Sequence, residues 1–362
     1  MIDRLSRIPG WAEAVVVGLA SRLFALAVLF VAWANGLPAA IGQHWSSPVL
    51  SWDAQWYLWV AGQGYHAGPV ARTAFGSGYH DFAFFPAYPG LIAAVSFGGA
   101  LSRDVVAPVL SNVLFVLALI PIRIVLERLT DRRIARFGLL LFALSPAAYV
   151  YSLAYSEPLF LLAAGLLFAT SGPVRGFALG AVAALTRLSG IGLAVASLPD
   201  LFDTRTRWRG IAAIGGVVVG FGAWWGYIAN LTHDFFGYMR GSPAWYSNDS
   251  ATGSPTGLAS LLHAQYSVVW VTVAFLGLYL IGVVVLFRRR EYRLGLFSAF
   301  CLASAWLVTW NTMPRLVALG FPAFATFAAV LPNDRVRWLF VGLSAAAEAV
   351  LAALAVAGYV VP

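Results

Sequence analysis

AEAVVVGLASRLFALAVLFVAW, residues 12–33, is the first of a series of long apolar blocks that fill this sequence. A helix needs about 20 predominantly apolar residues to cross the hydrocarbon core of a bilayer, and this block is long enough. A basic segment precedes the block and no small-residue cleavage site is evident within it. We therefore expect a retained first membrane span rather than a removed signal peptide.

The composition of the whole chain indicates the same class of protein. Of the 362 residues, 60% are hydrophobic and 10% are charged, and the mean hydropathy is +0.80. A soluble globular domain carries roughly 25% charged residues. The sequence therefore predicts an all-α polytopic membrane protein, in which a single integral membrane domain occupies residues 1–362.

The apolar blocks predict about ten to eleven transmembrane helices. Their expected ranges are 11–33, 105–126, 136–153, 157–172, 174–187, 189–202, 210–230, 266–287, 294–311, 315–331 and 335–360. The segment FFPAYPGLIAAVSFGGAL at 84–101 fits this arrangement only as a re-entrant or interfacial segment. The pair at 174–202 is short for two crossings, and irregular backbone at this depth is tolerated where protein or a water-filled cavity satisfies it.

The arginines predict the orientation of these helices. The net charge is +8, but the arginines lie in short loops between apolar blocks, which is an orientation signal and not a nucleic-acid footprint. The clusters are Arg4 with Arg7, 123–136, Arg175, 205–209, 288–293, and Arg335 with Arg337. We place all of them, and the N-terminus, on the cytoplasmic side of a plasma membrane. The use of arginine without any lysine favours a bacterial source.

This topology leaves a large first extracytoplasmic loop at about 34–104 and a second one at about 231–265. All five histidines fall in these loops, as do Asp53, Asp81, Asp234 and Asp249. We expect the chemistry on this face, although loops are also simply where polar residues collect.

The first loop contains SWDAQWYLW, residues 51–59, in which Asp53 stands among large aromatic side chains. An acid beside the membrane interface suits a general base, because low-dielectric surroundings raise its proton affinity and flanking rings can shape a pocket for a sugar. Capping of a helix by Asp53 explains the same residue without a catalytic role.

Further motifs favour the catalytic interpretation. They are SWDAQWYLWVAGQGY (51–65), FAFFPAYPGLI (82–92), LSPAAYVYSLAYSEPLFLL (144–162), ALTRLSGIGLA (184–194) and TMPRLVALGFP (312–322), in this order. Together they resemble the PIG-V-like mannosyltransferases, the family of the glycosylphosphatidylinositol second mannosyltransferase and its bacterial relatives. The likeness extends from about residue 50 to residue 322.

The resemblance implies the GT-C membrane glycosyltransferase fold, a polyprenyl-phosphate mannose donor and chemistry on the extracytoplasmic face. The family's first-loop acid corresponds to Asp53, which the resemblance implies is the base that deprotonates an acceptor hydroxyl. Transfer from a β-linked donor to an α-mannoside inverts the anomeric centre, so one carboxylate suffices. For a bacterial chain we expect a mannosylated lipid, a lipoglycan or another lipid-linked or cell-envelope glycan as acceptor.

The leaving phosphate calls for positive charge more than for a general acid. Arg315 in TMPRL and Arg187 in ALTRLSG lie in the matching motifs, and a guanidinium can grip phosphate oxygens through two parallel hydrogen bonds. We expect both to bind the donor phosphate and rank Arg315 first. Interfacial snorkelling of either arginine is the alternative.

The other expected substrate-binding residues line the same motifs: Trp52, Trp56, Tyr57, His80, Asp81, Tyr155 and Glu157. Helix capping by Ser156 explains the YSEPLF segment without a function. The histidines show no metal-ligand spacing, so we expect neither an obligatory metal nor another cofactor and leave divalent-metal dependence open.

A membrane transporter or lipid flippase is the rival hypothesis, in which Arg22 and Glu348 form an intramembrane relay. Both residues lie near the middle of their expected helices, the first and the last. Because unpaired charge there costs at least about 2.5 kcal/mol, we expect the two side chains to pair. A repeat of the kind that transporters use is not evident in the sequence.

Overall fold

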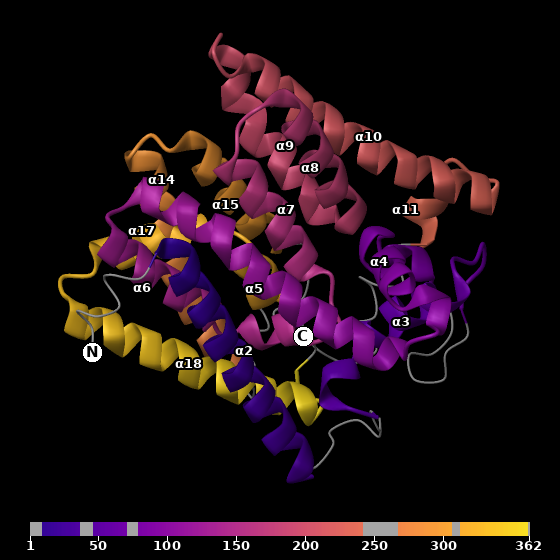
Figure 1. Cartoon of the computed structure of the whole chain (residues 1–362), viewed down its shortest axis with the longest axis horizontal. Helices are drawn as coiled ribbons and strands as arrows, with labels where there is room; N and C mark the ends of the chain where they lie inside the picture. The colour runs from indigo at the N-terminus through magenta and orange to yellow at the C-terminus, as the bar shows by residue number, and fades with distance from the viewer. Residues whose placement is uncertain (1–8, 37–45, 71–78, 242–266, 306–311, 361–362) are drawn as a thin grey trace.

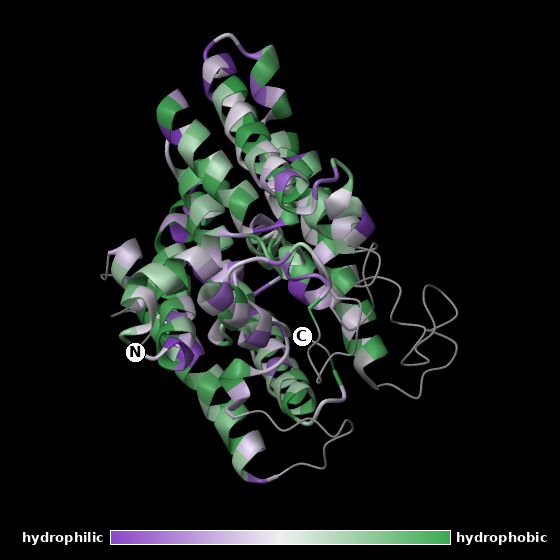
Figure 2. Ribbon diagram, turned by 90° about the vertical axis from the view of Figure 1, so that its right-hand side faces the viewer, coloured by the Kyte–Doolittle hydropathy of each residue, from purple (hydrophilic) through white to green (hydrophobic). Residues whose placement is uncertain are grey.

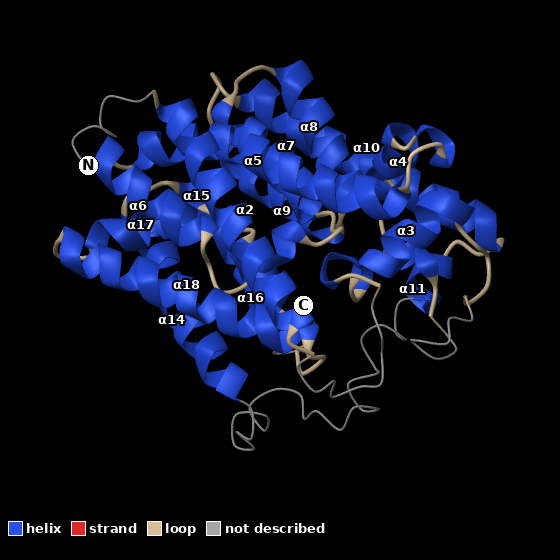
Figure 3. Ribbon diagram, turned by 60° about the horizontal axis from the view of Figure 1, so that its bottom comes forward, coloured by secondary structure: helices blue, strands red, loops and turns tan. Residues whose placement is uncertain are grey.

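The computed structural model describes residues 9–36, 46–70, 79–241, 267–305 and 312–360, and these residues form helices without a β-strand (Figure 3). The α-helices are α2 (Gly10–Ala34), α3 (Asp53–Gln63), α4 (Ala87–Val95), α5 (Arg103–Leu129), α6 (Arg132–Ala143), α7 (Glu157–Ala169), α8 (Pro173–Thr186), α9 (Ile191–Ser197), α10 (Arg207–Thr232), α11 (Gly237–Gly241), α14 (Ser267–Arg288), α15 (Tyr292–Ala305), α16 (Met313–Ala318), α17 (Pro322–Val330) and α18 (Asp334–Val356). The 3₁₀ helices are η1 (Pro48–Leu50), η2 (Asp81–Ala83), η3 (Phe97–Gly99), η4 (Ala148–Ser152), η5 (Leu188–Gly190) and η6 (Leu198–Phe202).

Five helices of the described chain, α2, α5, α10, α14 and α18, are long and apolar enough to cross a membrane. Shorter apolar helices, α7, α8, α15 and the segment Leu188–Phe202, accompany them. Figure 2 shows apolar residues along the long helices. The predicted all-α, multi-pass architecture is confirmed, while several of the about ten to eleven expected helices are too short to cross a bilayer as single rods.

The helices pack side by side in the order α18, α2, α5, α7, α8 and α10 (Figure 1). In the view of Figure 1, α10 forms the upper edge, α2 and α18 form the lower left, and α3 and α4 lie together at the right. The helix α5 runs from this α3–α4 end to the opposite end of the molecule. One end of the bundle therefore holds the compact helices of the first loop.

Two expected membrane helices, 136–153 and 315–331, are wrong as continuous elements. The helix α6 ends at Ala143, shortly before Pro146, and the chain continues as η4. The second range is divided into α16 and α17 just before Pro322. Proline lacks an N–H donor and restricts the residue before it, so helices tend to end there.

The early end of α6 explains a charged residue in the middle of α2. Arg22 donates hydrogen bonds to the carbonyl oxygens of Ala143 and Ala148, at 3.1 and 2.7 Å, and to the hydroxyl of Ser152 at 2.9 Å. These bonds satisfy carbonyl groups that a continuous helix would have used. The predicted pairing with Glu348 is confirmed, with 3.8 Å between Nη2 and the carboxylate.

The described parts of the first loop, residues 46–70 and 79–102, pack onto the helices. The expected re-entrant or interfacial segment 84–101 forms α4 and η3, and α4 covers only about 14 Å at 1.5 Å per residue, far less than a bilayer core. Tyr88 of α4 donates a hydrogen bond to the carbonyl oxygen of Ala107 in α5 at 2.9 Å. The packing of α3, α4 and α5 against one another gives the residues of α3 and α4 fixed positions.

Candidate active site

Four charged side chains, each predicted as a site residue, form a chain of alternating sign at the α3–α4 end of the bundle. Arg315 Nη1 lies 2.7 Å from Asp53 Oδ2, and Arg315 Nε donates a hydrogen bond to Glu157 Oε1. Arg187 Nη1 lies 2.5 Å from the same Glu157 oxygen. The order is therefore Asp53, Arg315, Glu157, Arg187, although these residues come from distant parts of the sequence.

Local structure presents each of these residues at the end of a helix. Asp53 opens α3 and Glu157 opens α7, while Arg187 follows the last residue of α8 with extended backbone. Arg315 lies in the short helix α16, which begins just before a proline. The ends of these helices therefore bring the four side chains to a common point.

Helix capping does not account for the two acids. The residue before Asp53, Trp52, has a positive φ of 55° and makes no side-chain capping bond, while Asp53 itself reaches Arg315. Such a backbone conformation is costly for a bulky residue and is found preferentially at functional sites. Ser156 also makes no capping bond; its hydroxyl lies 2.7 Å from the Tyr57 hydroxyl and 3.4 Å from Arg187 Nη1.

Burial distinguishes the two carboxylates. Glu157 is 0% exposed and lies between two guanidinium groups, whose positive charges compensate its negative charge directly. The Asp53 side chain is 25% exposed, and its Oδ1 accepts no hydrogen bond from the described residues. Asp53 is therefore the carboxylate that can receive a proton from a molecule outside the protein.

The two arginines also differ. Arg315 contacts both acids, through two of its nitrogens, and lies over the Tyr155 ring, 4.5 Å from its centroid. Arg187 contacts one acid, and its buried Nε has no hydrogen-bond partner among the described residues. A buried donor without a partner is costly, so Arg187 is the guanidinium better placed to receive an additional anion.

Aromatic residues expected to bind substrate form the wall behind these charges. Trp56 is 0% exposed and stacks on Phe84, with ring centroids 5.6 Å apart, and Tyr57 is 4% exposed. Trp52 donates its indole N–H to the carbonyl oxygen of Ala355 at 3.2 Å. The Tyr155 hydroxyl accepts a hydrogen bond from the backbone N–H of Asp53 at 3.2 Å. Their direct role toward substrate stays a prediction, while their packing fixes Asp53.

The expected substrate-binding residues His80 and Asp81 have different surroundings in the structure. Burial lowers the pKa of His80, an effect that the neighbouring Asp81 charge opposes, and its ring lies 4.6 Å from that of Phe82. Asp81 is 0% exposed and contacts His66, which sequence analysis did not single out. A histidine just after the end of α3 was the available signal, but its partner lies 15 residues further along.

The described residues contain no group of three or more His, Cys, Asp and Glu side chains that could hold a metal ion. Both acids of the charged chain already contact arginines. These contacts leave Asp53 Oδ1 and Glu157 Oε2 without an arginine, and only the Asp53 side chain is partly exposed, which fits proton transfer better than multidentate metal binding. The expected independence from metal remains a prediction.

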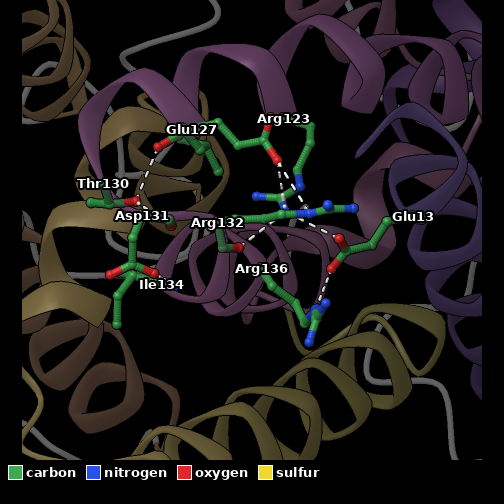
Figure 4. A network of polar contacts seen from close by, with 9 residues as sticks. Glu13, Arg123, Glu127, Thr130, Asp131, Arg132, Ile134 and Arg136 are labelled. Carbon is green, nitrogen blue, oxygen red and sulfur yellow. Dashed lines mark hydrogen bonds and ion pairs between the residues drawn. The ribbon is translucent and has the colours of Figure 1, made fainter. Parts of the chain in front are cut away.

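A second buried charged cluster connects the first turn of α2 with the last turns of α5 and with α6 (Figure 4). Glu13 accepts hydrogen bonds from Arg123, at 3.0 Å, and from Arg136. Arg123 also lies 3.0 Å from Glu127 and donates to the carbonyl oxygen of Arg132 at 3.0 Å. The cluster joins α2, α5 and α6 within one of the predicted cytoplasmic arginine regions.

Comparison with known proteins supports the resemblance stated from the motifs. Residues 26–183 match the family described as "Mannosyltransferase (PIG-V)", a range that includes Asp53 and Glu157 but ends before the two arginines. No protein of curated function matches the sequence.

Solved structures show the fold. The Archaeoglobus fulgidus oligosaccharyltransferase, crystallised with Zn and sulfate, is 13% identical with a TM-score of 0.52, over 95% of this chain and 53% of that one. Its apo form is 12% identical with a TM-score of 0.52, over 96% of this chain and 56% of that one. The chain thus spans about half the length of that protein and has a GT-C-type fold. The family match and the fold together support glycosyl transfer.

Proposed function

We propose that this protein transfers mannose, with inversion, from polyprenyl-phosphate mannose to a lipid-linked or cell-envelope glycan on the extracytoplasmic face of the membrane. The observation that carries the proposal is the contact between Asp53 and Arg315, 2.7 Å apart. It brings the first-loop acid of the mannosyltransferase match together with an arginine far outside the matched range. A base and a cationic group thereby occur in one site.

The reaction assigns a separate role to each end of the chain of charges. Asp53 Oδ1 takes the proton of an acceptor hydroxyl, whose oxygen attacks C1 of the mannose. The bond from C1 to the phosphate oxygen breaks on the opposite face, and the polyprenyl phosphate leaves with the electron pair. A positioned base contributes about 10²–10⁴ in rate to such a step.

The contacts suggest a division of work between the arginines. The sequence favours Arg315 as the first phosphate ligand, but Arg315 is held by Asp53 and Glu157 on two of its nitrogens. We assign Arg315 chiefly to the orientation of Asp53 and Arg187 chiefly to the donor phosphate. Glu157 then positions both guanidinium groups through one oxygen, rather than binding a sugar hydroxyl itself.

The proposal that the site lies on the extracytoplasmic face rests on the uneven distribution of arginines between the two ends of the bundle. The cluster of Glu13 and Arg123 lies at the end of α5 opposite the candidate site, and arginine-rich ends favour the cytoplasm. We expect an engineered cysteine at Gln63, at the end of α3, to react with an impermeant thiol reagent in intact cells. A cysteine at Thr204, just before α10, should react only after permeabilisation. The reverse labelling pattern would place the site in the cytoplasm.

The function is tested by incubating the purified protein with synthetic polyprenyl-phosphate mannose and an alkyl mannoside. Mass spectrometry should find the acceptor heavier by one hexose, together with free polyprenyl phosphate. Movement of intact donor across vesicles without bond cleavage would instead support the flippase. The structure gives that rival little support, because Arg22 already serves backbone carbonyls and Ser152.

A further inference from the structure

Asp81 and His66 form a dyad that the proposed reaction does not use. His66 Nδ1 lies 2.7 Å from Asp81 Oδ2, and the backbone N–H of His66 donates to both carboxylate oxygens at 3.2 and 3.3 Å. Asp81 is 0% exposed, so its carboxylate depends on these donors. With Nδ1 donating to Asp81, neutral His66 keeps an acceptor lone pair on Nε2.

The outer edge of His66 is available to a ligand. Its side chain is 44% exposed, whereas the Asp81 side chain is 0% exposed. The His66 ring lies beside the partly exposed indole of Trp59, with centroids 5.6 Å apart and planes inclined by 38°. An aromatic surface next to an oriented polar edge suits a saccharide, whose C–H faces pack on rings and whose hydroxyls need directed hydrogen bonds.

The loop that carries His66 is tied down on both sides. The Tyr65 hydroxyl donates to the carbonyl oxygen of Phe84 at 2.7 Å, and the Tyr65 ring packs on Trp224 of α10, 4.7 Å between centroids. The backbone N–H of Val70 donates to the carbonyl oxygen of Tyr79 at 2.8 Å. His66 is therefore held in position before any ligand arrives, which lowers the entropic cost of binding.

The dyad is too far from Asp53 to take part in bond formation. Asp53 opens α3, and the His66 ring packs beside Trp59, which lies six residues further along α3, so about 9 Å of helix separates the two positions at 1.5 Å per residue. A single sugar bound at Asp53 cannot reach His66, whereas an acceptor of several sugars can. A single ligand that occupies both positions would therefore be an extended glycan.

We propose that His66, oriented by Asp81 and flanked by Trp59, binds a distal sugar of the acceptor glycan. The proposal rests on the function proposed above and specifies its acceptor as an oligosaccharide rather than a monosaccharide. Its consequence is a preference in affinity for longer acceptors that depends on His66 but not on catalysis.

Methyl mannoside and methyl mannotrioside test the subsite on the full-length protein, by calorimetry without donor. The wild type should bind the trioside more tightly than the monosaccharide. His66→Asn should lower trioside affinity roughly five- to tenfold, the worth of about one hydrogen bond, and leave monosaccharide affinity unchanged. The asparagine amide can still donate to Asp81, so the fold should persist; His66→Ser provides the same comparison if thermal unfolding shows otherwise.

His233→Asn is the matched control. His233 is also an exposed loop histidine, at the end of α10 with a φ of 53°, a conformation that asparagine tolerates. It should leave both affinities unchanged. Equal wild-type affinity for the two sugars, or a trioside preference that survives in His66→Asn, overturns the subsite. Because no donor is present, failure of mannose transfer in the separate assay is a different result that rejects the proposed function.

Discussion

The acids that arginines hold in the two charged clusters differ in how far they are buried. At one end of the bundle, Glu13 is 4% exposed, is held by two arginines, and belongs to a cluster whose helices α2, α5 and α6 are near neighbours (Figure 4). At the other end, the chain from Asp53 to Arg187 joins four separate segments and ends in a carboxylate that is 25% exposed. The first cluster also has an exposed edge, since Glu127 is 33% exposed, and Arg123 Nε and Nη1 have no hydrogen-bond partner among the described residues. The contrast therefore lies in the central acids: Glu13 is closed off by its arginines, whereas Asp53 keeps one oxygen without an arginine contact.

This difference indicates what a buried ion pair can do. A closed pair must recover the cost of removing its charges from water through its own contacts, and it is weak support for any function. An open ion pair contains an atom that can still bind a substrate. The comparison predicts that substitutions in the open cluster change chemistry, whereas substitutions in the closed cluster change stability.

The largest effect is expected for Asp53→Asn. The amide can still accept a hydrogen bond from Arg315 but cannot take the acceptor's proton, so transfer should slow at least about 10²-fold. Donor affinity and thermal unfolding should stay near those of the wild type. Steady-state transfer and donor binding must be measured separately, because a structural Asp53 would lower stability and binding together. Near-normal turnover of this variant would reject Asp53 as the base.

Smaller effects on the kinetics of transfer are expected when lysine replaces Arg187 or Arg315, and the two variants should differ in which kinetic constant changes. Lysine keeps the charge but loses the planar fork. Arg187→Lys should raise the donor KM by roughly tenfold, the worth of one charge-assisted hydrogen bond, with a lesser change in kcat. Arg315→Lys should chiefly lower kcat, because Asp53 loses its orienting contact. The same KM and kcat pattern in both variants would contradict the division of work between them.

The sequence predicted the members of the site better than their contacts. Asp53, Glu157, Arg187 and Arg315 could be selected from motifs, yet Arg315 lies 262 positions from Asp53, and only the path of α16 shows that they touch. The sequence predicted Asp81 as a substrate-binding residue but indicated no partner for it. The three-dimensional partner is His66, because backbone and ring donors of the loop after α3 converge on that carboxylate.

The fold could be predicted from the sequence to a similar extent. Apolar length indicated the long helices α2, α5, α10, α14 and α18, since hydropathy reports what must avoid water. It could not show that α6 ends at Ala143 or that α16 and α17 are separate helices. Gly320 lies between them and so close to the Tyr279 hydroxyl that a side chain would collide with it. Such breaks depend on tertiary neighbours that compensate the freed backbone groups.

In the closed cluster, Glu13→Gln should act on stability alone. The amide keeps the size of the side chain but removes the buried negative charge that Arg123 and Arg136 contact, at a cost of about 2 kcal/mol. Thermal unfolding in detergent should begin earlier, while transfer per folded molecule should match the wild type. Asp53→Asn is the control, because it should lower turnover and leave thermal unfolding unchanged. A marked loss of turnover in Glu13→Gln would contradict the expected difference between the two clusters.

The smallest effect is expected for the coupling between Arg22 and Glu348, a pair that resembles neither cluster. Its members are buried in facing helices, but their 3.8 Å separation is longer than the three hydrogen bonds of Arg22 to the α6–η4 segment. Arg22→Ala should therefore destabilise the protein mainly by exposing unsatisfied carbonyl groups, and Glu348→Ala should cost less. In a double-mutant cycle of unfolding free energies, we expect a coupling of about 0.5–1 kcal/mol. Full additivity would show that the two charges do not interact, and that Arg22 is retained in the membrane for the carbonyl oxygens of Ala143 and Ala148 rather than for Glu348.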